Sequence, residues 1–172
     1  MKTKKNDRAL QNLINNTNLT AKARKEIEKI LEEADSYKPR ELYICIDGKP
    51  KVKKRPRTSF SYRMYNPSSG DEKLLRQTIQ RVLDRDFTVI ETPVELEVTF
   101  FLKTPESFSV SKKVLAEMGV LLPQGRPDVD NLLKLTQDAL NGLVYKDDSL
   151  VVKVSSAKFY SSQPRTEIFI SY

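Results

Sequence analysis

The chain has 172 residues, of which 31% are charged, and its formal net charge is +7. This length suits one domain with at most a small appendage, and it can bury a core without disulfide or zinc staples. No apolar run approaches the roughly 18 residues that would indicate a membrane span. The start MKTKKNDRALQ has no apolar segment behind it. We therefore expect neither membrane contact nor a secretory signal.

The residue types that are missing exclude several kinds of chemistry. The chain has no histidine and one cysteine, Cys45, which rules out Ser–His and Cys–His nucleophile pairs and zinc sites built from His or several thiolates. A lone cysteine in a strand-like run suits a reducing compartment, and we expect the cytoplasm. The basic balance favours nucleic acid as a partner, although many basic proteins bind none specifically.

Residues 1–38 are predicted to form a helical extension. Apolar residues recur at helical spacing from Leu19 to Ala34, after the N-cap types Asn18 and Thr20, and the other face carries mixed charge. We expect this helix to pack on its own domain rather than serve as a partner-binding arm.

The next segments are predicted to be a strand and a basic stretch. ELYICID at 41–47 has a strand pattern and ends before Gly48 and Pro50. The stretch KVKKRPR follows, and its prolines prevent a helix, so we expect an extended edge or loop. An extended basic segment can track a phosphate backbone, and arginine suits bidentate phosphate contact. A solvated loop or a localisation signal is the alternative.

The remaining elements complete a mixed pattern. We expect helices over 71–83 and 131–141, strands over 92–102, 149–160 and 165–172, and an irregular excursion over 103–125 with a short helix at 109–118. The last two strands, joined by the turn SSQP, suggest a hairpin. The predicted fold is α/β: an α+β-like mixed sheet of about four strands packed with two main helices. Its predicted domain covers residues 39–172, after the helical extension 1–38.

Acidic residues gather around the helix at 131–141. Asp128 and Asp130, at i and i+2 in an extended entry to the helix, point to one side and can share a hard cation such as Mg²⁺. Lys134 lies one turn beyond Asp130 and could meet a phosphate or orient a water. Asp147 and Asp148 would have to return along a nearly extended tether to join them, and we expect only one of these two to be a direct ligand. Alternatively, Asp128 is a simple N-cap and the second pair opens a turn.

The combination R-P-D-V-D-N-L-L-K, D-A-L-N-G and K-D-D-S, preceded by K-K-R-P-R and Y-N-P, resembles the RusA family of Holliday-junction resolvases from about residue 41 to the end. The resemblance implies a homodimeric, Mg²⁺-dependent endonuclease of compact mixed α/β fold, found in bacteria and their prophages. The family's catalytic aspartates would fall on Asp128, Asp130 and Asp148, with Asp147 accompanying them and the family's lysine on Lys134. The K-K-R-P-R element would face DNA.

The sequence thus predicts a structure-selective endonuclease that resolves four-way DNA junctions in recombination and repair. Mg²⁺, with Mn²⁺ as a possible substitute, is expected at Asp128, Asp130, Asp148 and Asp147. The predicted DNA-positioning residues are Lys51, Lys53, Lys54, Arg55, Arg57 and Arg126. Paired symmetric cuts need two sites related by a two-fold axis, which a homodimer supplies. The rival hypotheses are a general branch or flap nuclease and a non-catalytic DNA-binding or assembly protein with a structural acidic cluster.

Overall fold

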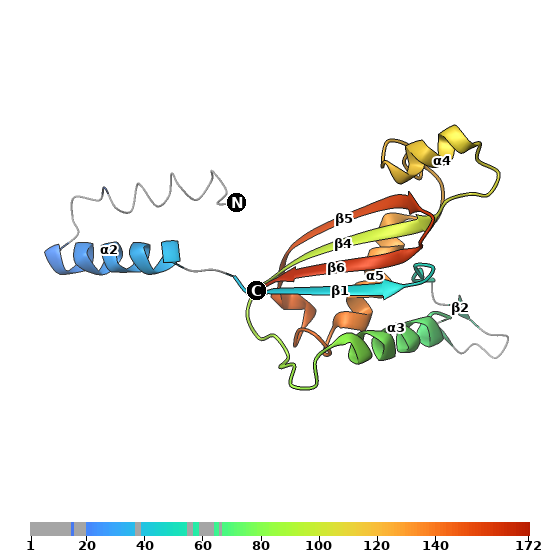
Figure 1. The fold of residues 1–172 in the computed structure, drawn as a ribbon. Helices are drawn as coiled ribbons and strands as arrows, with labels where there is room; N and C mark the ends of the chain where they lie inside the picture. The colour runs from blue at the N-terminus through green and yellow to red at the C-terminus, as the bar shows by residue number, and fades with distance from the viewer. Residues whose placement is uncertain (1–14, 16–19, 37–38, 55–56, 59–63, 66) are drawn as a thin grey trace. The chain divides into compact units, whose positions relative to one another are not determined.

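The computed structural model describes residues 15, 20–36, 39–54, 57–58, 64–65 and 67–172. The chain divides into two compact units, Met1–Pro39 and Arg40–Tyr172 (Figure 1). The first unit contains helix α2, Ala21–Ser36, and the hydroxyl of Thr20 accepts a hydrogen bond from the Ala23 amide at its start (3.3 Å). This is the N-cap arrangement that the sequence predicted for Thr20. Residues 1–14 and 16–19 of the predicted helical extension lie outside the described residues.

The second unit is built on a four-stranded mixed sheet. Its strands are β1 (Glu41–Asp47), β4 (Val94–Lys103), β5 (Val151–Ser161) and β6 (Arg165–Ser171), in the spatial order β1-β6-β4-β5. Strand β6 runs antiparallel to both β1 and β4, whereas β5 runs parallel to β4. The predicted mixed sheet of about four strands is therefore confirmed.

The predicted hairpin of the last two strands is wrong. Strand β4 lies between β5 and β6 and pairs with both, so the short connection at 162–164 crosses the end of β4. The physical reason is burial: β4 and β6 alternate buried side chains with exposed or half-buried ones, whereas β5 is exposed or half-buried along nearly all of its length. The strands with more buried side chains take the inner positions, where both backbone edges are paired.

Helices α3 (Ser69–Val82) and α5 (Val129–Leu140) cover one face of the sheet (Figure 1). Helix α5 has a fully buried side, on which Leu132, Leu135 and Ala139 are inaccessible to solvent. Leu132 and Ala139 join buried strand residues such as Val98 and Ile168 in one hydrophobic core. Two main helices packed on the sheet were predicted, and both are confirmed.

The excursion after β4 contains the predicted short helix. Helix α4 spans Val110–Glu117, and the side chain of its N-cap Ser109 accepts a hydrogen bond from the Lys112 amide. The carboxylate of Glu117 accepts hydrogen bonds from the hydroxyl of Ser161 and the amide of Ser162. These contacts attach the helix to the connection between β5 and β6.

The basic stretch after β1 forms neither helix nor strand over residues 49–54, as predicted. Two short strands, β2 (Arg57–Thr58) and β3 (Met64–Tyr65), pair antiparallel beyond it. Just before β5 a single 3₁₀ turn, η1 (Asp148–Leu150), replaces the start of the strand that the sequence placed at 149. Among the described residues no helix is long and apolar enough to cross a membrane.

Candidate active site

The start of α5 brings two of the predicted carboxylates together. Asp128 occupies the N-cap position in an extended conformation, and Asp130 lies in the first turn. The side-chain nitrogen of Asn131 is 3.5 Å from an oxygen of Asp128 and 3.5 Å from an oxygen of Asp130. The two carboxylate oxygens are therefore separated by no more than twice that distance.

The Asp128 carboxylate is not used as a helix cap. Its side chain makes no capping hydrogen bond, although the Leu132 amide donates to its backbone carbonyl. Asp128, Asp130 and Lys134 are all exposed. The simple N-cap interpretation therefore does not account for this side chain, and two carboxylates held open to solvent are the oxygen donors that Mg²⁺ prefers.

The second acidic pair is divided between two environments. Asp147 caps η1, where its carboxylate accepts a hydrogen bond from the Ser149 amide (3.0 Å). This contact with Ser149 is the main cause that holds the pKa of Asp147 below its ordinary value. Asp148 follows as the first residue of η1 and is exposed.

Tyr145, between α5 and the second acidic pair, is buried against the C-terminal half of α5. Its hydroxyl donates to the carbonyl oxygen of Gln137 on α5 (3.3 Å). Burial raises the pKa of Tyr145 to about 12, and the negative charges of Asp148 and Asp138 add to the rise.

The connection from α5 to Asp148 is compact rather than extended. Gly142 has a φ of +67°, which favours glycine, and its amide donates to the carbonyl of Tyr145 (2.8 Å). Within the described part of this single chain, no group of three or more Asp, Glu or Cys residues is close enough to hold a metal ion. The structure thus brings Asp128 and Asp130 together and does not gather Asp147 or Asp148 into one group with them.

The basic stretch lies against the start of α5. The Lys53 amide donates to the carbonyl of Asn131 (2.9 Å). A hollow of about 450 Å³ lies here, and its lining residues are Lys49, Pro50, Val52, Lys53, Arg126, Pro127, Asp128 and Asn131. The structure therefore places predicted DNA-contacting residues and one predicted metal ligand on the same hollow.

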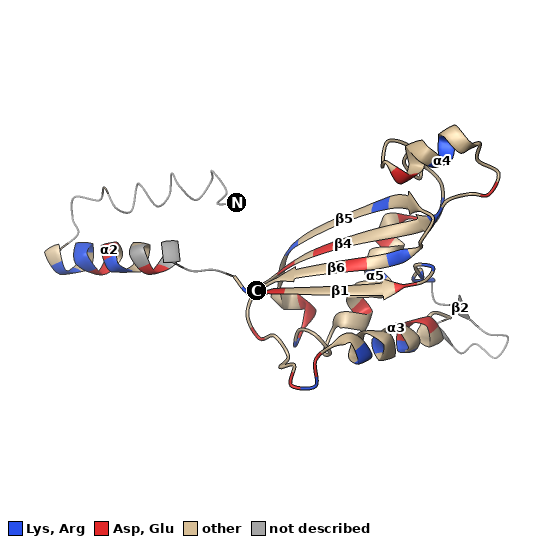
Figure 2. Cartoon of the chain, in the orientation of Figure 1, with Lys and Arg blue, Asp and Glu red and all other residues tan. Residues whose placement is uncertain are grey.

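The lysines of this stretch are paired with carboxylates. Basic and acidic residues both lie along α3, which supplies two of these carboxylates (Figure 2). Lys51 and Lys54 approach Asp71 at 3.3 and 3.7 Å, and both lysine side chains remain half exposed. Lys53 joins Glu72 of α3 to Asp138 of α5, at 2.8 and 2.6 Å. Burial alone would lower the pKa of Lys53, but its hydrogen bonds to Asp138 and Glu72 outweigh burial and raise it. Arg55 and the side chain of Arg57 lie outside the described residues.

Two further residues hold the two ends of α5, and the sequence analysis missed them. Lys158 on β5 donates to the carbonyls of Gly125 (2.8 Å) and Pro127 (3.0 Å), which immediately precede Asp128. Arg76 on α3 donates to three carbonyls at the end of α5, with Asn141 nearest at 2.6 Å. Lys158 stands opposite the buried Phe100 in the register of the sheet, and the sequence alone does not record that pairing.

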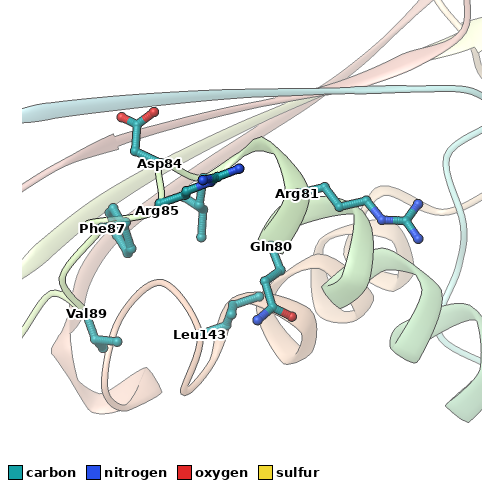
Figure 3. A pocket seen from close by; sticks show the side chains of 8 residues that line it. Gln80, Arg81, Asp84, Arg85, Phe87, Val89 and Leu143 are labelled. Atoms are coloured by element: carbon teal, nitrogen blue, oxygen red, sulfur yellow. The ribbon is translucent and has the colours of Figure 1, made fainter.

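A second hollow, of about 500 Å³, lies beyond the C-terminal end of α3. Its lining residues are Gln80, Arg81, Leu83, Asp84, Arg85, Phe87, Val89 and Leu143 (Figure 3). None of the predicted site residues lines it. It is therefore separate from the hollow at Asp128.

Fold and site together define a class: a small mixed α/β domain with a carboxylate pair at a helix start, beside a basic segment. A model of the endodeoxyribonuclease RusA family matches residues 47–171. The chain belongs to the RusA family. It is also 41% identical over 134 residues to the uncharacterized protein YqaN of Bacillus subtilis strain 168, a match that covers 75% of this chain and 94% of YqaN.

Proposed function

We propose that this chain is a Mg²⁺-dependent endonuclease that resolves four-way DNA junctions by paired phosphodiester cleavage, as a homodimer. The observation that carries the proposal is the pair Asp128 and Asp130, held around one Asn131 amide. Asp128 and Asn131 also line a hollow with Lys49, Lys53 and Arg126. Membership of the RusA family supports the same chemistry. We assign residues 39–172 to the endonuclease domain, and we propose branched DNA as its substrate.

The chemistry of the donors fits the proposed metal. Two exposed carboxylates at one helix start are hard oxygen ligands, and Mg²⁺ sites typically use one or two carboxylates with waters and a substrate phosphate. When bound, Mg²⁺ lowers the pKa of a bound water and offsets charge on the phosphate. Mn²⁺ prefers the same oxygen ligands and is a possible substitute.

Asp128 and Asp130 are proposed as the metal ligands that this structure already holds together. Asp148 is proposed as the third carboxylate because its side chain is exposed, whereas Asp147 is engaged in capping η1. Lys134, one turn after Asp130, is proposed to contact the scissile phosphate or to orient the attacking water.

The residues proposed to contact DNA differ in the ion pairs that they make in this structure. Lys51 and Lys54 are half exposed and, within the part of the chain that the structure describes, pair with Asp71 alone, so phosphate can compete for them. Arg126 is exposed beside Asp128. Lys53 holds two carboxylates, so its proposed contribution is chiefly to keep the basic stretch on α5. Arg55 and Arg57 are also proposed to contact DNA, on the basis of the sequence.

The test is cleavage of a synthetic four-way junction by wild type and Asp130→Asn, with Mg²⁺ and with EDTA. We expect the variant to lose at least about a hundredfold in cleavage rate, since it removes one of the proposed ligands. Junction binding should persist, because the substitution also removes a negative charge that repels phosphate. Wild-type cleavage by the variant would refute the assignment.

The same assay separates the rival functions. Equal cleavage of four-way, flap and linear duplexes at one salt concentration would indicate a general nuclease. No nicking by wild type at any Mg²⁺ concentration, with binding intact, would indicate a non-catalytic DNA-binding protein.

A further inference from the structure

The head groups of Lys51 and Lys54 are paired with one carboxylate, that of Asp71. Nζ of Lys51 lies 3.3 Å from one oxygen of Asp71, and Nζ of Lys54 lies 3.7 Å from the other. The two lysine side chains are 50% and 52% exposed, whereas that of Asp71 is 25% exposed. An anion with one oxygen facing each lysine is also the arrangement that a phosphate group would make with the same two lysines.

The basic stretch is held in place by contacts that do not involve Asp71. The Lys54 amide donates to the hydroxyl of Ser68 (2.6 Å), and the Lys53 amide donates to the carbonyl of Asn131 (2.9 Å). The ammonium of Lys53 adds the two ion pairs to α3 and α5 described above. These contacts fix the backbone at residues 53–54, whereas the ion pairs of Asp71 engage only two lysine head groups that face solvent.

Asp71 itself is fixed by the helix that carries it. It lies in the first turn of α3, where the helix dipole stabilises a negative charge. Helix α3 is anchored in the hydrophobic core through Leu75 and Ile79. A group held in the same chain acts on its neighbours at an effective concentration on the order of millimolar. Asp71 therefore stays beside the two lysines whenever another anion approaches them.

We propose that Asp71 is a built-in competitor of DNA phosphate, which pairs with Lys51 and Lys54 in the free protein and weakens the binding of any DNA that uses these lysines. The inference rests on the proposed function, because it requires the basic stretch to contact DNA. Non-specific binding to linear duplex depends almost entirely on phosphate contacts. A competitor at two lysines therefore keeps a chain of net charge +7 from being held on DNA that it does not cleave.

The substitution Asp71→Asn tests the inference, because it removes the charge and keeps a polar side chain of nearly the same size. In EDTA and at low salt, the variant should bind a fluorescently labelled linear duplex about three- to tenfold more tightly than wild type, because two half-exposed ion pairs no longer compete. The plot of log affinity against log salt concentration should steepen by about 1–2, since one or two more phosphates are contacted. Asp71→Ser should show the same changes and serves as a second variant.

Asp84→Asn is the matched control, because it changes the net charge by the same amount. Asp84 is exposed beyond the other end of α3, about 20 Å away along the helix, and its carboxylate makes no ion pair within the described part of the chain. At a Debye length of about 10 Å, this control should change the duplex affinity by less than about twofold. In a Lys51→Ala/Lys54→Ala background, Asp71→Asn should no longer tighten binding, because no lysine is left to release.

Equal affinities and equal salt dependence for Asp71→Asn and Asp84→Asn would overturn the inference, because net charge alone would then account for the effect. Weaker duplex binding by a folded Asp71→Asn variant, judged by circular dichroism, would also overturn it and would show that Asp71 positions the lysines for DNA. Both of these outcomes leave the proposed function standing. If wild type bound neither the duplex nor a four-way junction, the proposed function and this inference would fail together.

Discussion

Lys53 offers the sharpest test of how the basic stretch is held on the domain. Its ammonium is largely buried and joins Glu72 to Asp138, so it connects α3, α5 and the stretch that follows β1. Lys53→Met keeps most of the apolar stem and removes the charge. The two carboxylates then lose their shared partner and repel each other.

The expected loss of folding stability follows from the two ion pairs of Lys53. A hydrogen bond between charged groups contributes about 1.5–3 kcal/mol. The Glu72 and Asp138 side chains are 26% and 34% exposed, so water replaces part of each contact and we expect a total loss of about 2 kcal/mol. For a chain of this size, that corresponds to a fall in Tm of about 4–8 °C.

The assay is chemical and thermal denaturation of the full-length protein, with a matched control. Lys51→Met removes a neighbouring lysine that is half exposed and has one carboxylate partner, Asp71. We expect this control to change the free energy of unfolding by less than about 0.5 kcal/mol. Adding Glu72→Gln and Asp138→Asn to Lys53→Met should recover part of the loss, because the unpaired carboxylates are then gone. A loss no larger than that of the control, or no recovery, would refute the reasoning.

Two further predictions concern Lys158 and Tyr145. Lys158→Met should lower the cleavage rate about tenfold or more while junction binding stays near wild type, because the loop before Asp128 loses two hydrogen bonds; an unchanged rate at saturating Mg²⁺ would contradict this. The pKa of Tyr145 is raised from 10 to about 12, so its neutral form is favoured in the folded state. Its contribution to stability is complete below pH 10 and is lost as the pH rises toward 12. Between pH 10 and 12, the free energy of unfolding should therefore fall less in Tyr145→Phe than in wild type. Equal falls in the two proteins would show that the ionisation of Tyr145 is not linked to folding.

Local patterns in the sequence determined much of this protein. The spacing of apolar residues predicted the helix that became α5, and the pattern over 92–102 predicted the strand that became β4. Both patterns depend on which side of one element meets the core, so a single segment carries the information. Likewise, two aspartates two residues apart at a helix start were bound to lie close together, and Asn131 contacts both.

Only the tertiary structure decided which distant segments meet. Strand β4 separates β5 from β6, although the short turn between them suggested a hairpin. Strand order depends on which edges the whole sheet buries, and no local pattern records that competition. The attachment of Lys53 to Asp138 and of Lys158 to the loop before Asp128 likewise joins residues far apart in the chain. The candidate site residues could be named from the sequence, whereas the supports that hold them in place depend on long-range packing.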